Sequence, residues 1–501
     1  MADTQGKKTA QPTTKVEDAK SLLDQVLVKG FRTKTEEQKT EAKKDIEALV
    51  RDLMSGVRFG SKRVDKALQE RIDALDALLS RQTAAILHRP ELQKLEGSWR
   101  GLRYLVDKTN TSPMLKVHVL NANKDELRTD QENFGEAFDE TELYKKVYER
   151  EYGTFEGSPY GALIGDFEWS HSSDDVALLT GLAKVAANAH APLITAPSPE
   201  LFGLDDFTQI DGMLDFDKIF GDGKTYAKWN SFRESEDSRY VGLVMPRFLA
   251  RMPYGMDSRS GAGSFNFEEQ VDGTHHDHYV WSNAAYVYGA RLTDAFDRHG
   301  WCVAIRGVQG GGLVENLPTH VFKTDEGALA MKCPTEVPVN DRQEATLSKL
   351  GFLSLVHGKD KDYAAFFGGQ SAHKVNERLR NNKVAMANEE LSSRLPYLFA
   401  VSRFAHYLKS MLRDWTGGFY ERSAIEEKLN RWIGAYVLLN DSAGQEIKAK
   451  FPLREAKIEV ASVDGRPGYY RAVAYLRPHF QLEEIDVSLR LVADLPKRVK
   501  G

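Results

Sequence analysis

Residues 160–196 read YGALIGDFEWSHSSDDVALLTGLAKVAANAHAPLITA, and this stretch decides the fold of the central region. Tyr160–Phe167 and Pro192–Ala196 are short apolar runs with the length of buried strands. Between them, Asp174–His190 carries apolar residues at helical spacing, including Val176 and Leu179. Strand, helix and strand in this order predict a βαβ unit, in which a helix covers two parallel strands.

On either side of this unit the sequence predicts further strands and a further helix. Four further segments are predicted to be strands: Lys116–Leu120, Tyr240–Met245, Trp301–Ile305 and Phe352–Val356. A helix is predicted over Trp281–Arg298, where apolar residues recur at helical spacing. We therefore place an α/β core at residues 111–380, within a fold of the mixed α/β (α+β) class.

Residues 16–110 are predicted to form a helical N-terminal domain behind a disordered polar tail, residues 1–15. Three apolar stripes indicate helices: Ile46, Leu49, Val50 and Leu53; then Val64, Leu68, Ile72, Leu75 and Leu79; then Leu92, Leu95, Trp99, Leu102 and Val106. Ser61 is a plausible N-cap for the second helix, and Pro90 suits the first turn of the third.

An earlier short helix is indicated by four apolar residues before Gly30: Leu22, Leu23, Val26 and Leu27. A helix of this length is not stable alone in water, so it must dock on another surface. Two interpretations stay open, a surface helix packed on its own domain and a detachable recognition helix that lies in a partner's groove.

The C-terminal part is predicted to change from helix to strand. Residues 381–445 contain an apolar stripe from Leu391 to Leu412, a Gly417-Gly418 break and a second helix over Ser423–Leu438. In residues 446–501, Lys457–Val460 and Tyr469–Leu476 flank Asp464-Gly465, which indicates a hairpin. Strict alternation then predicts a strand through Ile485, Val487, Leu489 and Leu491.

Composition excludes several classes of protein. The chain has 501 residues, a net charge of −5 and 2 cysteines. It therefore lacks the basic balance of a nucleic-acid binder and the cysteines for a disulfide framework or a four-cysteine zinc site. The sequence shows neither the apolar core of a signal peptide nor a run of about 20 apolar residues. We expect a cytoplasmic protein with no direct membrane insertion.

The glycine-rich and histidine-rich segments do not complete a known site. Gly307–Gly312 follows a predicted strand but lacks the Gly-Lys-Ser/Thr ending of a phosphate-binding loop, which favours a tight turn over nucleotide binding. His275–His278 is the densest cluster of possible metal ligands, yet the sequence has no matching ligand pair elsewhere, which favours a polar loop.

Other candidates are equally incomplete. Gly369–His373 departs from a nucleophile elbow because His373 replaces the second glycine. Cys302 lies in an apolar run and is expected to be an inert packing group. Asp174-Asp175 precedes a helix and suits its dipole, and Asp205-Asp206 has no nearby titratable partner in sequence. We therefore expect no catalytic residues, no metal and no cofactor.

Seven segments, taken together and in order, carry a family resemblance. They are LEGSWRGLRYLV (95–106), PELFG (199–203), RFLARMPYG (247–255), NAAY (283–286), AFDRHGWCVAIRGVQGGGLVE (295–315), KCPTE (332–336) and AFFGGQS (365–371). The chain resembles the large subunit of the bacterial type VI secretion contractile sheath, most strongly over residues 95–501.

The resemblance implies a structural, non-enzymatic role. Such subunits pair with a small sheath subunit and stack with further copies into a helical tube around an inner tube of hexameric rings. The tube stands on a baseplate and contracts to drive the inner tube and its effectors outward. An AAA+ ATPase then recognises an N-terminal helix of the large subunit and recycles it. Two alternatives remain: a non-contractile scaffold of related fold, and an α/β enzyme that uses the loop at 307–312.

The resemblance also assigns roles to three sets of residues. The ATPase-recognised helix is matched by Leu22, Leu23, Val26 and Leu27. Strands shared between subunits are matched by Ile458, Val460, Ile485, Val487, Leu489 and Leu491. The candidate inner-tube face comprises Arg413, Glu421, Arg422, Glu426, Glu427, Lys428 and Arg431. An ordinary solvated helix face is the alternative explanation for these charges.

Overall fold

The computed structural model describes residues 61–481 and a few positions between 38 and 51. Within 61–481 the gaps are residues 136, 211, 213–215, 256–266, 270, 274, 325, 377, 379–380, 441, 464, 466–468 and 480. The chain divides into two compact units, residues 1–86 with 254–269 and residues 87–253 with 270–501. Several predictions lie outside the described residues. They concern the tail (residues 1–15), the first apolar stripe (Ile46 to Leu53), the short helix with Leu22, Leu23, Val26 and Leu27, and the strand with Ile485, Val487, Leu489 and Leu491.

The larger unit is built on a six-stranded sheet with the order β1-β2-β3-β9-β10-β6. These strands are β1 (Leu163–Trp169), β2 (Leu193–Pro197), β3 (Val241–Met245), β9 (Phe352–His357), β10 (Ala364–Phe366) and β6 (Leu313–Val314). The first four are parallel, and β10 runs antiparallel to both β9 and β6. The predicted βαβ unit is confirmed, with Leu163 opposite Leu193 and α7 (Ser173–Ala189) between the strands.

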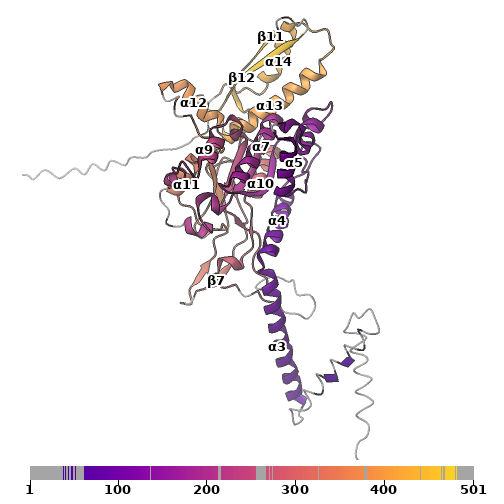
Figure 1. Cartoon of the computed structure of the whole chain (residues 1–501), viewed down its shortest axis with the longest axis vertical. Coiled ribbons are helices and arrows are strands. Elements are labelled where there is room, and N and C mark those ends of the chain that lie inside the picture. The colour runs from indigo at the N-terminus through magenta and orange to yellow at the C-terminus, as the bar shows by residue number, and fades with distance from the viewer. Residues whose placement is uncertain are drawn as a thin grey trace, which may run out of the picture. The chain divides into compact units, whose positions relative to one another are not determined.

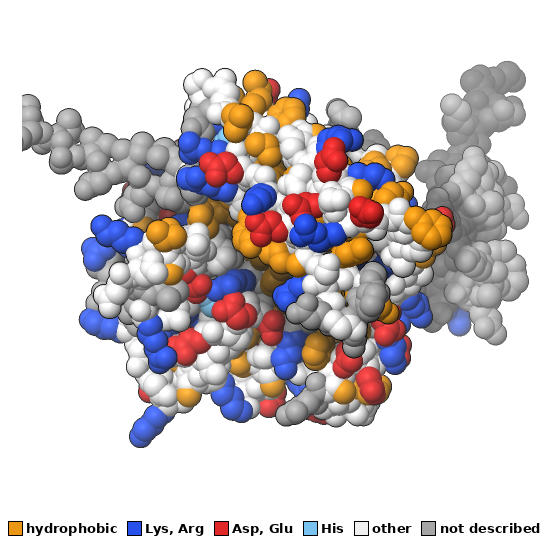
Figure 2. Space-filling model, turned by 90° about the horizontal axis from the view of Figure 1, so that it is seen from above, with side chains coloured by type: hydrophobic (Ala, Val, Ile, Leu, Met, Phe, Trp, Pro, Cys, Tyr) orange, Lys and Arg blue, Asp and Glu red, His pale blue; other side chains and the backbone are white. Residues whose placement is uncertain are grey.

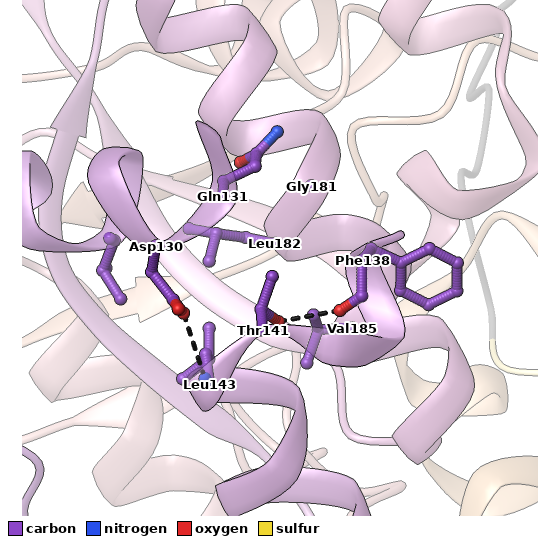
Figure 3. A pocket seen from close by; sticks show the side chains of 9 residues that line it. Asp130, Gln131, Phe138, Thr141, Leu143, Gly181, Leu182 and Val185 are labelled. Atoms are coloured by element: carbon purple, nitrogen blue, oxygen red, sulfur yellow. Dashed lines mark hydrogen bonds between the residues drawn. The ribbon is translucent and has the colours of Figure 1, made fainter. Parts of the chain in front are cut away.

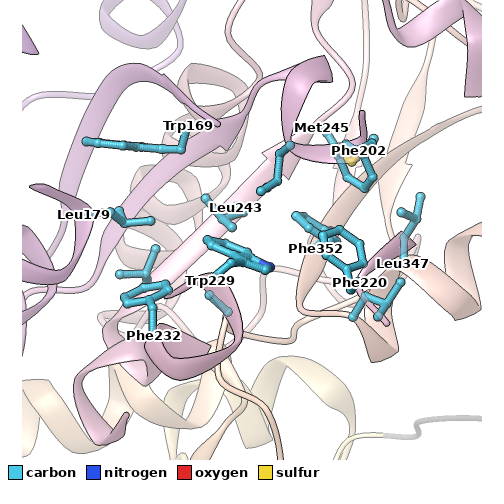
Figure 4. Close-up of a cluster of buried hydrophobic side chains, with 14 of the residues drawn as sticks. Trp169, Leu179, Phe202, Phe220, Trp229, Phe232, Leu243, Met245, Leu347 and Phe352 are labelled. Atoms are coloured by element: carbon cyan, nitrogen blue, oxygen red, sulfur yellow. The ribbon is translucent and has the colours of Figure 1, made fainter. Parts of the chain in front are cut away.

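Helices cover both faces of this sheet (Figure 1). On one face lie α7, α8 (Phe216–Ile219), α9 (Ala227–Glu234) and α11 (Asp341–Lys349); on the other lie α10 (Ala285–His299) and the start of α13 (Leu395–Asp414). Figure 4 shows the hydrophobic core on the first of these faces, where Trp169, Trp229 and Phe352 are almost completely buried. Burying each such side chain stabilises the fold by about 1.5–3 kcal/mol.

Smaller elements connect these layers. The helical ones are α5 (Lys124–Phe134), η1 (Phe138–Glu140), α6 (Glu142–Tyr144), η2 (Lys145–Tyr152), η3 (Pro199–Phe202), η4 (Phe207–Ile210), η5 (Glu236–Tyr240) and η6 (His276–His278). Two further strand pairs are β4 (Phe248–Leu249) with β5 (Trp281–Ser282), and β7 (Val321–Lys323) with β8 (Leu329–Met331).

Two predicted strands are wrong. Lys116–Leu120 forms no strand. Trp301–Ile305 is a turn followed by irregular chain, although Trp301, Val303 and Ile305 are buried. Trp301 and Val303 pack with the C-terminal helices, whereas Ile305 packs under the sheet. The segment is apolar because its residues are buried in two different hydrophobic cores. A buried apolar segment need not pair with a neighbouring strand, so the apolar run did not indicate a strand here.

The apolar face predicted for α4 (Pro90–Asp107) is wrong at three of its five residues. Leu95, Trp99 and Val106 are exposed, and the buried positions of α4 are Gly97, Gly101 and Leu105. A Cβ atom on Gly97 would lie 2.4 Å from the carbonyl oxygen of Trp281, so only glycine permits this contact. The helix therefore packs through two glycines together with Leu105, against which Leu102 also packs.

The second apolar stripe lies on α3 (Ser61–Leu87), which begins at the predicted Ser61. This helix has 27 residues and is therefore about 40 Å long. Ile72, Leu75, Leu79 and Ile86 are all about half exposed. Their spacing of three, four and seven residues places them on one face, so α3 presents an uncovered apolar stripe within the described residues.

The C-terminal region adds a helical layer and a hairpin. Its elements are α12 (Lys383–Ser392), α13, α14 (Arg422–Gly434), α15 (Gln445–Lys450), β11 (Leu453–Ser462) and β12 (Tyr470–Pro478). The predicted hairpin is confirmed, whereas the stripe predicted from Leu391 belongs to two helices that are separated at Ser393-Arg394. The Trp301 and Phe404 rings stack 4.3 Å apart in the core of this layer.

Candidate functional site

The C-terminal hairpin has one edge that its own chain already fills. Ile458 on β11 lies opposite Ala474 on β12, and α14 runs beside β11. The Asn430 side chain of α14 accepts a hydrogen bond from the Ile458 N–H at 2.9 Å and donates one to the Ile458 carbonyl at 2.7 Å. The amide of Asn430 thus makes both hydrogen bonds that a neighbouring strand would make.

Two charged residues of α14 likewise form hydrogen bonds with the backbone of Val460. The Val460 N–H donates to Glu426 Oε2 at 3.0 Å, and Arg422 Nη1 donates to the Val460 carbonyl at 3.3 Å. The side chains of Ile458 and Val460 are themselves buried against α13 and α14. The polar groups and side chains of both residues are therefore satisfied within one chain.

The opposite edge of the hairpin is open in the part of the chain that the structure describes. The N–H and C=O groups of Ile458 point away from β12. Ile458 and its partner Ala474 therefore form a non-hydrogen-bonded pair of the ladder. By the same register, the N–H and C=O groups of Ala472, Ala474 and Leu476 point outward from β12. Within the described residues these groups bond to no other segment. An edge of this kind is where another strand can be added.

Arg413, Arg422 and Glu426 of the predicted inner-tube face are engaged inside the chain. Arg413 at the end of α13 donates to the backbone carbonyls of Tyr152 and Thr154, at 2.8 and 2.5 Å. Arg422 and Glu426 hold β11, as described above. These three charged side chains therefore bind other parts of the same chain.

The other four lie at the surface of α14 and its approach. Glu427 and Arg431 form an exposed ion pair at 2.5 Å, and the Lys428 ammonium lies 3.9 Å from the Tyr420 ring centre. Glu421 occupies the N-cap position without a side-chain cap hydrogen bond, and the nearby Phe419 is fully exposed. On the face that Figure 2 shows, charges of both signs alternate with hydrophobic side chains.

A polar cluster lies at the carboxyl ends of the parallel strands, the edge where α/β enzymes place their sites. Arg247, which follows β3, binds buried Glu336 in a fork, with Nε–Oε2 at 2.8 Å and Nη2–Oε1 at 3.0 Å. Glu168 of β1 lies 3.7 Å from the same guanidinium. Burial raises the pKa of the Glu168 carboxyl, and the Arg247 charge opposes that rise. The sequence offered no signal for this cluster, since its members come from distant segments.

The histidine cluster meets the same carboxylate. His276 Nε2 lies 3.2 Å from Glu336 Oε1 and 3.9 Å from Asp206 Oδ2. One ligand atom from each of these three residues lies within 4.8 Å of the others, which is close enough for a metal ion. However, both Glu336 oxygens already accept hydrogen bonds from Arg247, so an ion would have to displace a guanidinium. The cluster is better explained as a structural ion-pair network around Arg247 and Glu336.

The remaining candidate motifs also have structural explanations. Gly307–Gly312 is a turn, as predicted; a Cβ on Gly311, whose φ is +92°, would lie 2.1 Å from the Ala304 carbonyl oxygen. Ser371 is completely buried, and His373 contacts Ser238, Ser235 and Glu389 at 2.9 to 3.1 Å. Burial raises the pKa of the Cys302 thiol to about 12, in agreement with an inert packing role.

Asp175 and a hollow beside α7 have structural explanations as well. Asp175 accepts hydrogen bonds from Lys124 and Ser170 near the start of α7, and these lower the pKa of its carboxyl although burial opposes them. The hollow between α5, α6 and α7 measures about 290 Å³ including open solvent (Figure 3). The polar groups at its wall are already paired, since Asp130 accepts from the Leu143 N–H and Thr141 donates to the Phe138 carbonyl.

Comparison with known proteins gives the class to which this fold belongs. The model of the EvpB/VC_A0108 tail sheath N-terminal domain matches residues 69–373, and that of the EvpB/VC_A0108 tail sheath gpW/gp25-like domain matches residues 384–495. The chain belongs to this family of tail sheath proteins. The resemblance inferred from the seven sequence segments is therefore confirmed.

The relative that specifies the class further is the type VI secretion system sheath protein TssC1 of Pseudomonas aeruginosa. It is 43% identical over 498 residues, which are 99% of each chain. Two of the solved structures that show similarity come from the anti-feeding prophage. One is its baseplate (TM-score 0.35, 8% identity, 64% of this chain and 66% of that one), and the other is its contracted helical sheath (TM-score 0.28, 12% identity, 64% and 75%).

Proposed function

We propose that this chain is the large subunit of a type VI secretion contractile sheath. The single observation that carries the proposal is the end-to-end kinship with a sheath protein of that system. In this role the chain pairs with a small sheath subunit and polymerises with its own copies around an inner tube of hexamers. The tube stands on a baseplate and is recycled by an AAA+ ATPase, for which the helix around Leu22, Leu23, Val26 and Leu27 is the recognition segment.

The open edge of β12 is where we place strand exchange between subunits. A strand from a neighbouring chain would pair with Ala472, Ala474 and Leu476, because α14 already occupies the β11 edge at Ile458 and Val460. The alternating segment Ile485 to Leu491 is our candidate for the donated strand. Backbone hydrogen bonds of this kind hold subunits together while each one rotates as a rigid body during contraction.

The apolar stripe of α3 supports pairing with the small subunit. Ile72, Leu75, Leu79 and Ile86 recur at the spacing of a coiled-coil seam and are about half exposed. A partner helix that covered them would remove a continuous apolar surface from water. Replacing Leu75 and Leu79 by lysine should therefore prevent co-purification of the small subunit, whereas Ala77→Lys on the other side of α3 should not.

The exposed part of α14 is our candidate for the contact with the inner tube. Glu421, Glu427, Lys428 and Arg431 provide charges of both signs, and Phe419 provides one apolar contact. Exposed charge pairs contribute about 0–1 kcal/mol each, so such a contact is weak enough to release when the sheath contracts. Arg413, Arg422 and Glu426 support this surface from within the chain.

We further propose that the chain is no enzyme, acts in the cytoplasm and neither binds nucleic acid nor inserts into a membrane. Both Glu336 oxygens are bound by Arg247, and backbone atoms lie against the glycines of the 307–312 loop, which disfavours the enzyme alternative. Among the described residues no helix is both long and apolar enough to cross a bilayer.

Co-expression with the small subunit of the same secretion cluster tests the proposal. We expect long hollow tubes by electron microscopy, and tubes of a shorter, wider form after triggering. A stable, monodisperse monomer in the presence of that partner would contradict the sheath role. Tubes of one form only, under all conditions, would instead support the static scaffold.

A further inference from the structure

The stretch Lys116–Leu120 has the sequence of a strand but no strand partner among the described residues. Two valines alternate with Lys116 and His118, a pattern that favours a strand. The chain continues from here without a turn or a bend to the start of α5. No backbone N–H or C=O group of residues 116–122 forms a hydrogen bond with any other described residue. These seven residues, which we call the extended segment, therefore carry unused backbone donors and acceptors.

Side-chain contacts near its two ends hold the extended segment beside β1, the edge strand of the six-stranded sheet. Near one end, the His118 ring packs edge-on against Tyr160, just before β1, with 5.9 Å between the ring centres. Just past the other end, Lys124 Nζ donates to the carbonyl oxygen of Glu168, near the end of β1. A capping box at Asn123 then fixes the start of α5. A partner strand would thus meet a segment that is already extended, which lowers the entropy cost of pairing.

Apolar side chains in and next to the extended segment are uncovered. Met114, Val119 and Leu120 are each more than half exposed. One exposed apolar side chain needs no explanation, but here several of them coincide with unpaired backbone groups on one stretch of chain. An exposed apolar strand edge of this kind is where a strand from another chain can add.

The charge of the region indicates which strand would fit. From Lys108 to Lys124 the chain has three lysines and neither Asp nor Glu. Lys116 is exposed, and the ion pairs among the described residues do not include it. In a strand, Lys116 and His118 lie on one face and the two valines on the other. Because opposite charges across a strand pair are favourable, the matching strand alternates apolar residues with Asp or Glu.

We propose that the extended segment is a strand-addition site, at which an acidic strand of the small sheath subunit pairs with residues 116–122. The identity of this partner rests on the sheath role proposed above. Since the alternating C-terminal strand of each copy is assigned to the β12 edge, the strand at this second site comes from the other subunit. Main-chain hydrogen bonds supply the affinity, and the alternating side chains supply the specificity.

Hydrogen exchange of the full-length chain, alone and in the co-purified heterodimer, tests the pairing. Mass spectrometry with electron-transfer fragmentation reads the amides one by one, and those of residues 116–122 should exchange freely in the chain alone. In the heterodimer every second amide should slow by about tenfold or more, because alternate N–H groups of a strand point to the same edge. A heterodimer in which these amides exchange as fast as before would overturn the strand-addition site alone. Failure to recover any heterodimer would overturn the sheath role as well.

Two double proline variants distinguish strand pairing from simple contact. Val117→Pro with Val119→Pro removes the N–H groups of one edge, and His118→Pro with Leu120→Pro removes those of the other. Neither change breaks a backbone hydrogen bond of the chain alone, so both variants should melt like the unaltered chain. We expect one variant to bind the small subunit about tenfold or more weakly and the other to retain most of the affinity. Equal binding by both, or equal loss in both, would overturn the proposal.

Photo-crosslinking identifies the strand that binds. With benzoylphenylalanine in place of Leu120, illumination of the assembled sheath should link this position to a small-subunit peptide that has Asp or Glu at alternate positions. Lys116→Glu should weaken binding, most strongly at low salt, whereas Lys359→Glu in the turn between β9 and β10 should not. A cross-link to a second copy of this chain, or equal binding by the two lysine variants, would overturn the proposed partner.

Discussion

The side-chain amide of Asn430 makes two hydrogen bonds with the backbone of Ile458, at 2.9 Å to the N–H and 2.7 Å to the carbonyl. Through this pair, α14 takes the place of a third strand beside β11. Among the described residues, the hairpin is thereby left with one open edge, on β12. In our proposal, a helix side chain as well as the strands therefore decides where this chain can join another.

Replacing Asn430 by leucine should loosen β11. The change would leave a partly buried N–H and carbonyl of Ile458 unpaired, at a cost of about 1–3 kcal/mol for each group. Hydrogen exchange of the Ile458 amide should accelerate, while exchange in β1 to β3 should not change. Asn188→Leu is the matched control, because Asn188 makes only one bond within its own helix, to the Lys184 carbonyl. Equal exchange at Ile458 in the Asn430 variant and the unaltered chain would contradict this role.

Proline substitutions in β12 should separate folding from assembly. Ala474→Pro removes an outward N–H, so we expect the hairpin to fold and tube formation to fail. Val473→Pro removes an N–H that pairs with Glu459 across the hairpin, and should instead destabilise it by about 1–3 kcal/mol. Electron microscopy of the co-expressed sheath and a melting curve distinguish the two. Normal tubes from the Ala474 variant would show that the β12 edge is not used.

Gly101→Ala should destabilise the larger unit by roughly 1–3 kcal/mol, because its Cβ would lie 2.3 Å from the Tyr286 ring and the Ser282 hydroxyl. The control is Gly434→Ala at the end of α14, where a Cβ meets nothing within 4 Å. That change should be neutral or stabilising by up to about 1 kcal/mol. Urea unfolding measures both, and equal stabilities would refute the close packing of α4.

Acid should destabilise the fold through His406. Burial lowers the pKa of His406 to about 4, and Arg403, His190 and Lys409 around it act in the same direction against one opposing bond to the Ala189 carbonyl. In the unfolded chain His406 therefore takes up a proton near pH 6.5, whereas in the folded chain it stays neutral until about pH 4. Stability should fall as the pH drops through this window, by at most about 3 kcal/mol.

His406→Gln should flatten that part of the pH profile, as measured by urea unfolding at a series of pH values. His190, whose pKa is also lowered by burial, supplies a smaller residual slope. A profile that His406→Gln does not change would rule out this residue as the source.

Periodicity predicted the central fold because long, fully buried segments leave a regular signal. The strands β1, β2, β3 and β9 and the helix α7 all lie where apolar runs and helical spacing placed them. The same reasoning failed for α4, because the residues that pack most closely there, Gly97 and Gly101, carry no apolar signal. It also failed at Trp301–Ile305, whose apolar residues serve two cores.

The site was less accessible from sequence than the fold. The hairpin could be predicted, but its blocked edge depends on Asn430, Glu426 and Arg422, which read as ordinary polar residues of a surface helix. Similarly, Glu168, Arg247 and Glu336 meet only after the sheet has formed. Such pairings depend on three-dimensional proximity, for which a single sequence has no periodic pattern.

A cryo-EM reconstruction of the sheath co-expressed with its small subunit tests the central claim most directly. We expect a strand from a neighbouring chain to lie beside β12, with backbone hydrogen bonds to Ala472 and Ala474, while Asn430 remains on Ile458. A reconstruction in which the β12 edge faces solvent, and subunits meet without strand pairing, would contradict the account.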